Sequence, residues 1–398
     1  MTAEPPNTVE QVHMVDLFAG PGGLDVAAHW LGVTVDGVEW DDDACATREA
    51  AGLRTLHADV RDFGPRDFPE ATVLAGGPPC QTYTVAGRGE GRRALETVLG
   101  YVKRMGAGHD VRPELKTLDD ERTGLVLEPL RWAIEAWQAG RPYEAIVLEQ
   151  VPAVLPVWLA YKDALEGLGE ESLKESVRSG ESGKTATARK DSKYRVVCGI
   201  LHTEEFGVPQ TRKRAILIAR LTNEEVPRLP EPTHRRYRKG VKRAEGDPEL
   251  REWVTMAEAT EIPRSFKVVS NYGTGGDPKA RGERKSVEPA ATVTGKVTRN
   301  RVVMSDGTED RFTPPLAGRL QTFPKDYPWS GKAVGQQIGN AIPPRLAVHV
   351  LAAALGRKPV EESLDSAVKG SWTATKDSCP VKTVPLTAEA EQLDITRL

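Results

Sequence analysis

The feature that most constrains the fold is an ordered alternation of short apolar runs and helix-length amphipathic segments, from Val12 to about Arg220. This alternation is typical of α/β proteins, in which helices join parallel strands and cover both faces of a sheet. Apolar residues at a 3.6-residue period predict helices over Gly23–Leu31 and Leu125–Gln138. The predicted strands are His13–Leu17, Thr34–Glu39, Val73–Ala75, Ala145–Glu149, Tyr194–Ile200 and Arg214–Arg220.

The sequence changes in character after Arg220, where prolines and basic clusters replace the periodic segments. We therefore expect a first α/β domain at 12–221, a second, smaller domain at 222–330, a segment at 331–357 that returns to the first domain, and a polar C-terminal tail at 358–398. A proline pair predicts a helix over Pro343–Leu355. Two polar interruptions suggest irregular structure. Gly167–Lys193 is expected to be a solvated loop, and Arg88–Arg122 is either a loop or a mobile lid.

Charge and cysteine content exclude several classes of protein. The chain has 54 basic and 57 acidic side chains, a net charge of −3, so any nucleic-acid surface must be a local patch. The cysteines lie far apart without a Cys-x-x-Cys pair, so we expect neither a metal site nor a disulfide framework, and a reducing cytoplasm is the natural setting. The sequence shows no secretory signal and no span long enough for a bilayer. The cysteines are Cys45, Cys80, Cys198 and Cys379.

One cysteine stands on a rigid turn. Residues 76–81, Gly-Gly-Pro-Pro-Cys-Gln, follow the apolar run 71–75. The proline pair fixes two φ angles, and the glycines allow a ligand to approach the backbone closely. A strand that ends in such a turn presents its side chain at the carboxyl edge of a sheet, where α/β enzymes bind ligands. We interpret Cys80 as a nucleophile and Cys198, which lacks such a turn, as an inert buried thiol.

Three motifs in the first part of the chain describe a nucleoside site. The glycine-rich turn within residues 16–24 lies between the first strand and the first helix, and Asp25 stands where a dinucleotide-binding motif needs its third glycine. At the end of the next strand, the Glu39 carboxylate can bind both ribose hydroxyls and the Trp40 indole offers a face for adenine. Asp59-Val60 has the position expected for a contact to the adenine amino group. Together they fit S-adenosylmethionine and argue against a nicotinamide oxidoreductase.

The motifs together resemble those of bacterial DNA (cytosine-5)-methyltransferases, in order from Asp16 to about Leu351. The Pro-Cys-Gln and Gln-x-Arg-x-Arg blocks are each specific. The region 222–318 carries little resemblance, as expected for the variable target-recognition region of that family. The matching blocks are Asp16–Leu24, Glu39-Trp40, Asp59-Val60, Gly76–Gln81, Arg122–Arg131, Glu149–Val151, Gln210–Arg214, Arg319–Pro324 and Gly339–Pro344.

The resemblance implies a class I S-adenosylmethionine-dependent methyltransferase fold, which is Rossmann-like with a mostly parallel sheet. Residues 12–221 would be the catalytic and cofactor-binding domain and 222–330 the target-recognition domain, and the segment that contains Asn340 would cover the cofactor. The residues that would line the cofactor site are Phe18, Gly20, Gly22, Gly23, Glu39, Trp40, Asp59, Val60, Pro79, Leu125, Asn340 and Ala341. The residues that would act on the base are Cys80, Glu149, Arg212 and Arg214.

These four side chains suit methyl transfer to carbon 5 of cytosine. Addition of the Cys80 thiolate to carbon 6 turns the ring into an enamine, so that carbon 5 can attack a sulfonium methyl group. Glu149 is placed to act as the acid at nitrogen 3, with a pKa raised by partial burial. Arg212 and Arg214 share one face of an extended segment and can hold the oxygen-2 edge. Because the target carbon is out of reach inside a duplex, the base must be flipped out.

Two positions leave questions open. For Arg212, a base contact and structural support are both compatible with the sequence. Gln150 stands where the family usually has Asn, so the amide that normally braces the Pro-Cys loop is one methylene longer. We expect activity to be retained, at the usual or a reduced rate.

Basic residues gather in the second domain. His234–Arg243 holds six Lys or Arg in ten positions and is either a set of phosphate contacts or a solvated linker. Thr292-Val293 resembles a Thr-aliphatic pair that the family keeps near the flipped nucleotide, and residues 299–301 are candidate base-edge readers. The residues expected at the DNA are Gln81, Arg88, Arg235, Arg236, Arg238, Thr292, Arg299 and Arg301.

The sequence thus predicts a monomeric, cytoplasmic and nucleoid-associated enzyme that methylates double-stranded DNA, solitary or paired with a cognate restriction endonuclease. The alternatives are an RNA cytosine-C5 methyltransferase and a catalytically weak DNA-binding protein of the same fold. The size of region 222–330 favours DNA. The presence of Cys80, Glu149 and the Asn340 segment favours catalysis.

Overall fold

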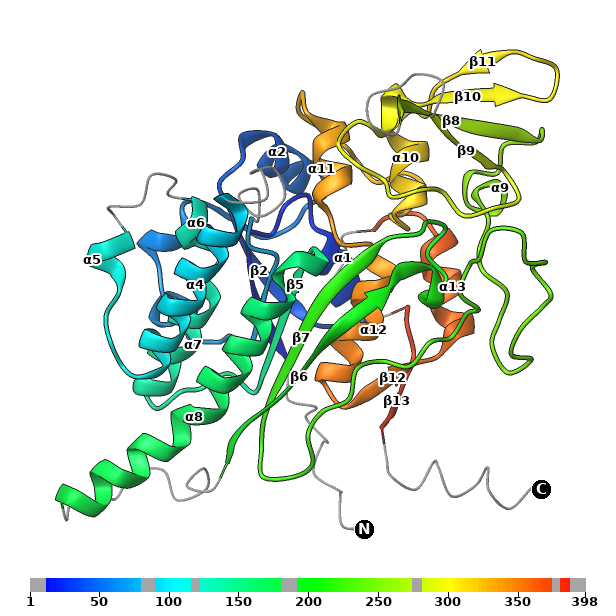
Figure 1. Cartoon of the computed structure of the whole chain (residues 1–398). Coiled ribbons are helices and arrows are strands. Elements are labelled where there is room, and N and C mark those ends of the chain that lie inside the picture. The colour runs from blue at the N-terminus through cyan, green and yellow to red at the C-terminus, as the bar shows by residue number, and fades with distance from the viewer. Residues whose placement is uncertain are drawn as a thin grey trace, which may run out of the picture.

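The computed structural model describes residues 12–79, 90–115, 122–179, 192–273, 281–373 and 380–386 (Figure 1). Within these residues, a central seven-stranded sheet has the order β3-β2-β1-β4-β5-β7-β6. The first five strands in this order run parallel, and β7 and β6 add an antiparallel hairpin at one edge. The strands are β1 (His13–Leu17), β2 (Thr34–Glu39), β3 (Thr55–His57), β4 (Val73–Gly76), β5 (Ala145–Gln150), β6 (Lys193–His202) and β7 (Lys213–Thr222).

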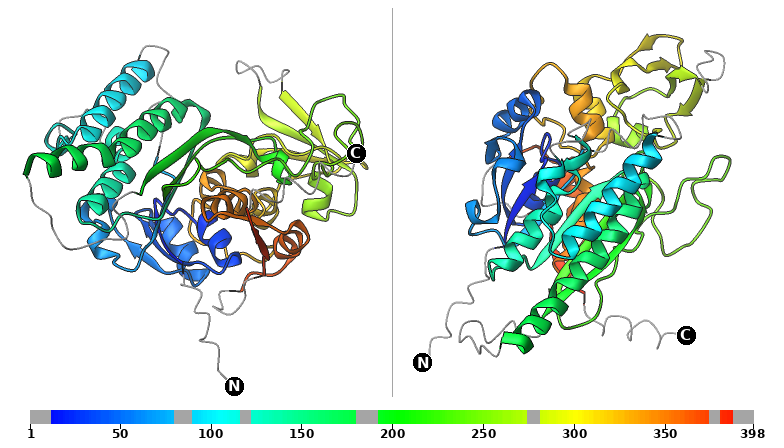
Figure 2. Two further views of the ribbon diagram at one scale, coloured as in Figure 1. Left: turned by 90° about the horizontal axis from the view of Figure 1, so that it is seen from below. Right: turned by 60° about the vertical axis from the view of Figure 1, so that its left-hand side comes forward.

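Helices cover both faces of this sheet (Figure 2). Alternate strand residues face opposite cores: Met14 packs in the cluster beneath α1 and α12, and Val15 in the cluster beneath α4, α7 and α8. Trp132 and Trp158 are fully buried in the second of these clusters. The helices are α1 (Gly23–Trp30), α2 (Asp42–Ala50), α4 (Glu90–Gly106), α5 (Arg112–Leu115), α6 (Arg122–Leu125), α7 (Glu128–Gln138), α8 (Leu155–Ser179) and α12 (Pro344–Ala354).

The six predicted strands are all present, and β1 and β2 have the predicted bounds. The predicted helices correspond to α1, to α6 and α7, and to α12. The sequence prediction missed α2 and the three-residue β3. The start of α2 is fixed by Asp41, whose carboxylate accepts a hydrogen bond from the amide of Ala44 at 2.8 Å.

Both polar interruptions are largely helical, which corrects the sequence analysis. Glu90–Gly106 forms α4 in place of a loop, because Leu95, Val98 and Val102 recur at helical spacing, and the two valines are fully buried. Residues 167–179, expected to be a solvated loop, instead continue α8 through a stretch that contains Glu170, Glu171 and Glu175, a residue type that favours helix, and 180–191 lie outside the described residues. In the part of the chain that the structure describes, no helix, α8 included, is long and apolar enough to cross a membrane.

A separate core forms between residues 256 and 338. An antiparallel sheet in the order β11-β10-β8-β9 packs with α9, α10 and α11, and Phe266, Val302 and Ile338 lie in the same cluster. Residues 222–255 are instead fastened in part to the first domain, where the amides of Thr233 and His234 bond to the Glu205 carbonyl. The elements are β8 (Phe266–Gly273), β9 (Arg281–Lys285), β10 (Arg301–Met304), β11 (Glu309–Asp310), α9 (Met256–Thr260), α10 (Pro314–Leu320) and α11 (Val334–Asn340).

The C-terminal region is docked where the structure describes it. α13 (Glu361–Lys369) buries Leu364 completely, and β12 (Arg357–Pro359) pairs with β13 (Thr383–Pro385). Arg345 of α12 forms ion pairs with Glu361 and Asp365 of α13. A polar tail starting at 358 is therefore wrong for residues 361–369, whose few apolar side chains fall on one helix face.

Candidate active site

The predicted site residues of the first domain gather at the carboxyl ends of parallel strands. The glycine-rich turn follows β1, Glu39 ends β2, Pro78 follows β4, and Glu149 lies next to the end of β5. Because these four strands are parallel, their carboxyl ends meet at one edge of the sheet. Cys80, Gln81 and Arg88 lie outside the described residues.

The glycine-rich turn is built for close contact. Gly20 and Gly22 have φ values of 55° and 100°, and Phe18 also has a positive φ of 60°, a conformation that side chains rarely adopt. A Cβ on Gly23 would lie 2.4 Å from the Ile342 carbonyl oxygen. The turn is therefore in direct contact with the chain just after Asn340 and Ala341, as the sequence predicted for a returning segment.

Glu39 ties this turn to the end of β2. Its Oε2 accepts a hydrogen bond from the amide of Gly20 at 2.6 Å, and its Oε1 accepts from the amides of Trp40 and Asp41 at 2.9 and 2.8 Å. A carboxylate has about four acceptor positions, so Oε2 keeps a lone pair for a further donor. The Trp40 indole is 65% exposed, an unusual position for so large an apolar group.

Asp59 and Val60 form the next part of this edge. Asp59 caps η1 (Val60–Asp62), and its carboxylate accepts hydrogen bonds from the amide and guanidinium of Arg61. Burial acts to raise the pKa of Asp59, but the bonds from Arg61 outweigh it and lower that pKa. Val60 is buried. Leu125, at the end of α6, packs against the same core cluster as Phe18.

Glu149 and Arg214 form a buried ion pair. β5 and β7 are antiparallel neighbours, which brings the Arg214 Nε onto Glu149 Oε1, and both side chains are about nine-tenths buried. Burial raises the pKa of the Glu149 carboxyl, and the Arg214 charge offsets part of that rise. A Cβ on Gly77 would lie 3.6 Å from Glu149 Oε2, so the turn that leads to Cys80 passes directly over this acid.

Gln150 braces the proline turn despite its extra methylene. Its Nε2 donates a hydrogen bond to the Pro78 carbonyl at 2.6 Å, and its Oε1 accepts from the amide of Val151. Pro79 follows within the same turn and is partly exposed. The side chain therefore makes the contact that the sequence analysis expected of this position.

Arg212, in contrast to Arg214, is committed to the backbone. Its Nη1 donates to the Val293 carbonyl at 2.7 Å, and its Nη2 donates to those of Gly339 and Ala341 at 2.8 and 3.5 Å. The side chain is only 3% exposed. Of the two alternatives that the sequence left open, this geometry supports the structural one.

The segment around Asn340 joins the two cores. A Cβ on Gly339 would lie 2.2 Å from the amide nitrogen of Gly295, so two backbones cross there. Asn340 is exposed and its Oδ1 accepts a hydrogen bond from Gln336, while Ala341 is buried. Tyr327, which the sequence analysis missed, donates its hydroxyl proton to the Pro21 carbonyl in the glycine-rich turn.

The candidate DNA-binding residues in the second half divide into free and engaged side chains. Arg236, Arg238 and Arg299 are exposed, but the Nη2 of Arg236 donates to the His202 ring at 2.8 Å. Arg235 is held by its own loop, because its guanidinium donates to the carbonyls of Asp247 and Arg243, and Arg301 forms an ion pair with Glu309. Thr292 is exposed, and its hydroxyl donates to the carbonyl of Thr211.

Two arginines near the site, Arg48 and the largely buried Arg131, escaped the sequence analysis. Arg48 of α2 is fully buried and binds both carboxylate oxygens of Asp25 at 2.8 and 2.7 Å. Asp16 is buried beside them, and burial raises its pKa, with Asp25 adding to the rise. Arg131 lies behind Val60. The signal for Arg48 was a charged residue inside an otherwise apolar helix, Asp25 in α1, and the signal for Arg131 was its place at the end of the matching block Arg122–Arg131.

Comparisons with known proteins agree with this geometry. Residues 12–101 and 184–355 match the C-5 cytosine-specific DNA methylase family. Type II methyltransferase M.AquIA of Picosynechococcus sp. is 30% identical over 232 residues, which cover 56% of this chain and 76% of that protein. Type II methyltransferase M1.HphI of Haemophilus parahaemolyticus is 26% identical over 378 residues, which cover 86% of each. The crystal structure of the S. pombe Dnmt2 methyltransferase matches with a TM-score of 0.54 at 16% identity, covering 87% of this chain and 98% of that one, and so shares the fold.

Proposed function

This chain belongs to the C-5 cytosine-specific DNA methylase family, and on that premise we propose that it methylates cytosine within one specific sequence of double-stranded DNA, on a flipped-out base held covalently by Cys80. Its reaction is the transfer of a methyl group from S-adenosylmethionine to carbon 5 of cytosine in DNA. The observation that carries the proposal is the buried pair of Glu149 and Arg214 beneath the turn at Gly77, three residues before Cys80.

The residues at the sheet edge fit S-adenosylmethionine. The exposed indole of Trp40 offers a face for adenine, and Glu39 retains a lone pair on Oε2 for a ribose hydroxyl. The positive φ angles of Gly20 and Gly22 let the backbone come close to a ligand without side-chain obstruction. When bound, S-adenosylmethionine supplies an electrophilic methyl group.

The base-side residues perform covalent catalysis. The Cys80 thiolate adds to carbon 6 of cytosine, and Glu149 gives a proton to nitrogen 3 as electron density moves into the ring. Carbon 5 then takes the methyl group, and the sulfonium sulfur leaves as the thioether S-adenosylhomocysteine. A base removes the carbon 5 proton, Cys80 leaves as the double bond between carbons 5 and 6 forms again, and nitrogen 3 returns its proton to Glu149. Burial lets Glu149 keep its proton to higher pH than an exposed glutamate, and Arg214 fixes its orientation.

Covalent capture tests this mechanism. DNA that carries 5-fluorocytosine cannot release fluorine from carbon 5, so the bond to the enzyme persists. With S-adenosylmethionine present, the wild-type protein should form a denaturation-resistant adduct and Cys80→Ala should form none. Cys198→Ala is the matched control, because burial raises the pKa of the Cys198 thiol to about 12 and leaves it protonated at neutral pH. An adduct in Cys80→Ala as abundant as in the wild type would overturn the assignment.

We also propose that region 222–330 selects the target sequence. The exposed Arg238 and Arg299 support this, since exposed guanidinium groups can reach phosphates and guanine edges. Relatives such as M1.HphI are named type II methyltransferases, which supports pairing with a cognate restriction endonuclease. Nanopore or bisulfite sequencing of DNA from cells that express the protein should reveal one methylated motif. Methylation spread over unrelated sequences would contradict the proposal. The monomeric state and the nucleoid location stay predictions.

A further inference from the structure

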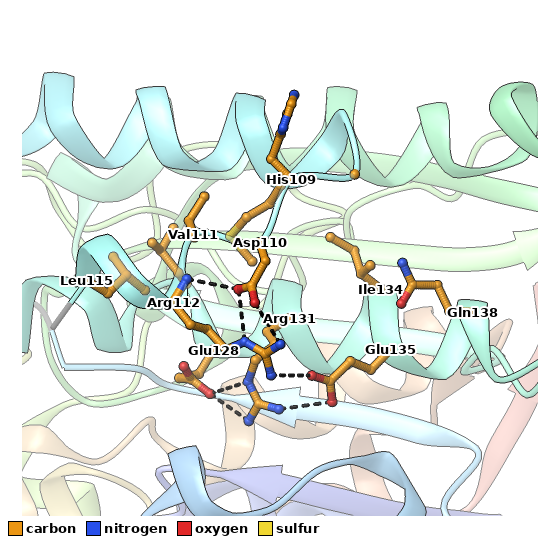
Figure 3. A pocket seen from close by; sticks show the side chains of 13 residues that line it. His109, Asp110, Val111, Arg112, Leu115, Glu128, Arg131, Ile134, Glu135 and Gln138 are labelled. Carbon is orange, nitrogen blue, oxygen red and sulfur yellow. Dashed lines mark hydrogen bonds and ion pairs between the residues drawn. The ribbon is translucent and has the colours of Figure 1, made fainter.

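Arg131 of α7 lies behind the turn that begins at Val60. Its Nη2 donates hydrogen bonds to the carbonyl oxygens of Val60 at 3.1 Å and Phe63 at 2.8 Å. Glu128 accepts from its Nε at 2.7 Å and Glu135 from its Nη1 at 2.9 Å, and Figure 3 shows the guanidinium between these two carboxylates. The guanidinium is thus bound to carboxylates of its own helix on one side and to the turn on the other.

Helix α7 holds this guanidinium in a fixed position. Glu128 and Glu135 stand three residues before and four residues after Arg131, a spacing that places all three on one helix face. Glu128 is buried, and the neighbouring Trp132 is fully buried in the core. A planar guanidinium that is already oriented by two carboxylates loses little further freedom when it binds a carbonyl.

The turn itself is short, and its internal side-chain bonds run from the amide and guanidinium of Arg61 to the Asp59 carboxylate. η1 contains three residues, and the backbone bond from the amide of Asp62 to the Asp59 carbonyl is 3.1 Å long. Short 3-10 turns have weak hydrogen-bond geometry. Arg61 thus holds the Asp59 side chain within the turn, and Arg131 binds the Val60 and Phe63 carbonyls of the turn from behind.

We propose that Arg131 is a positioning residue for the adenine end of the S-adenosylmethionine site. It fastens the Val60 and Phe63 carbonyls, so that the backbone of the turn keeps Asp59 and the buried Val60 in place at the ligand site. This rests on the proposed cofactor role of Asp59 and Val60, and Arg131 itself acts only through them.

A pocket beside the guanidinium makes the proposal testable by chemical rescue. The pocket has a volume of about 120 Å³, is lined by residues of α7 and of the loop before α5, and includes Arg131 in its wall (Figure 3). Removal of the Arg131 side chain would join the space it leaves to this pocket. A small guanidinium ion could then enter and bind the same carbonyls.

The first test is equilibrium binding of S-adenosylmethionine by isothermal titration calorimetry. Arg131→Ala should weaken binding about tenfold, the effect expected when charge-assisted hydrogen bonds to the turn are lost. Arg112→Ala is the matched control. Arg112 lines the same pocket and pairs on the surface with Asp110 at 2.9 Å and with Glu135 at a longer 3.8 Å, so its removal should change affinity by less than about twofold. Binding of S-adenosylmethionine needs neither DNA nor the Cys80 thiolate. The measured affinities can therefore be interpreted even if the proposed covalent mechanism is wrong.

The second test separates positioning from general damage. Methylguanidinium should restore the affinity of Arg131→Ala but not that of Asp59→Ala, and kcat at saturating S-adenosylmethionine should stay close to that of the wild type. If Arg131→Ala does not fold, Arg131→Lys keeps the pairing with Glu128 and should show an intermediate affinity. Unchanged affinity in a folded Arg131 variant, or a lowered kcat with unchanged affinity, would overturn the proposal.

Discussion

Removal of the Gln150 amide should slow methyl transfer by loosening the turn that carries Cys80. The Gln150 Nε2 donates to the Pro78 carbonyl at 2.6 Å. Prolines lack an amide hydrogen, so the Pro78-Pro79 pair cannot be fastened through its own N–H groups. The Gln150 bond therefore holds the turn at its carbonyl, two residues before the nucleophile.

The size of the effect follows from this geometry. A net hydrogen bond contributes about 0.5–1.5 kcal/mol, which corresponds to a factor of about 2 to 12 in an equilibrium constant. In Gln150→Ala the turn should occupy its reactive position less often by this factor. Gln150→Asn shortens the side chain by about 1.5 Å. The donor would then lie roughly 4 Å from the Pro78 oxygen, beyond hydrogen-bonding range, so Gln150→Asn should be as slow as Gln150→Ala.

The assay is single-turnover methyl transfer at saturating S-adenosylmethionine and DNA. Gln150→Met is the matched control for packing, because it keeps the length of the side chain and loses both hydrogen bonds. It should be as slow as Gln150→Ala, while S-adenosylmethionine affinity stays unchanged in all three variants because Glu39 is untouched. A Gln150→Ala rate equal to that of the wild type would refute the reasoning.

Three other perturbations have defined outcomes. Gly37→Ala places a Cβ 1.8 Å from Arg48 Nη2 and should displace this buried guanidinium. The free energy of unfolding, measured by urea titration, should fall by about 3–5 kcal/mol. An unchanged urea midpoint would contradict the contact. Arg214→Gln removes the charge that lowers the pKa of Glu149, so the alkaline fall of the single-turnover pH profile should move to higher pH, and a fall that stays in place would argue against Glu149 as the acid. Burial lowers the pKa of His234 to about 3, so the unfolded chain binds a proton that the folded one does not, and stability should fall as pH drops from about 6.5 towards 3. His234→Gln should flatten this slope in urea titrations repeated at several pH values, and an unaltered slope would assign it to other groups.

Local sequence patterns predicted helices and strands correctly where apolar side chains recur at one period along the whole element. The period-2 and 3.6-residue patterns found β1, β2 and α1 because the buried residues of each are mostly apolar, with Asp16 in β1 and Asp25 in α1 as buried exceptions. The 3.6-residue pattern did not reveal α4, because glycine and charged residues surround its buried valines in the sequence. It failed for α13 because one fully buried leucine, Leu364, was too little to stand out from the polar sequence around it.

From the sequence, we could predict only those candidate site residues that lie at or next to the end of a strand. Glu39 and Glu149 were found because each ends or nearly ends an apolar strand. Arg48 and Arg131 were missed because their partners are distant in sequence: Asp25 is 23 residues away from Arg48, and Val60 is 71 away from Arg131. These contacts between residues distant in the sequence depend on the strand order of the folded sheet, which local patterns do not predict.

The two arginines of the Gln-x-Arg-x-Arg block have different roles, and the alternation of side chains along the chain does not predict which role each one has. Period 2 correctly places Arg212 and Arg214 on one face, but it does not say what each side chain meets. β5 pairs with β7 as far as the pair of Gln150 and Ala215, so Arg214 is the first residue past the end of this pairing and still reaches Glu149. Arg212 lies two residues further on, where β5 has ended and the backbones at Val293 and Gly339 fill the space, so its guanidinium binds carbonyls of both. The end of β5 therefore separates an arginine that tunes the acid from an arginine that joins the two cores, although the two are neighbours on the same face.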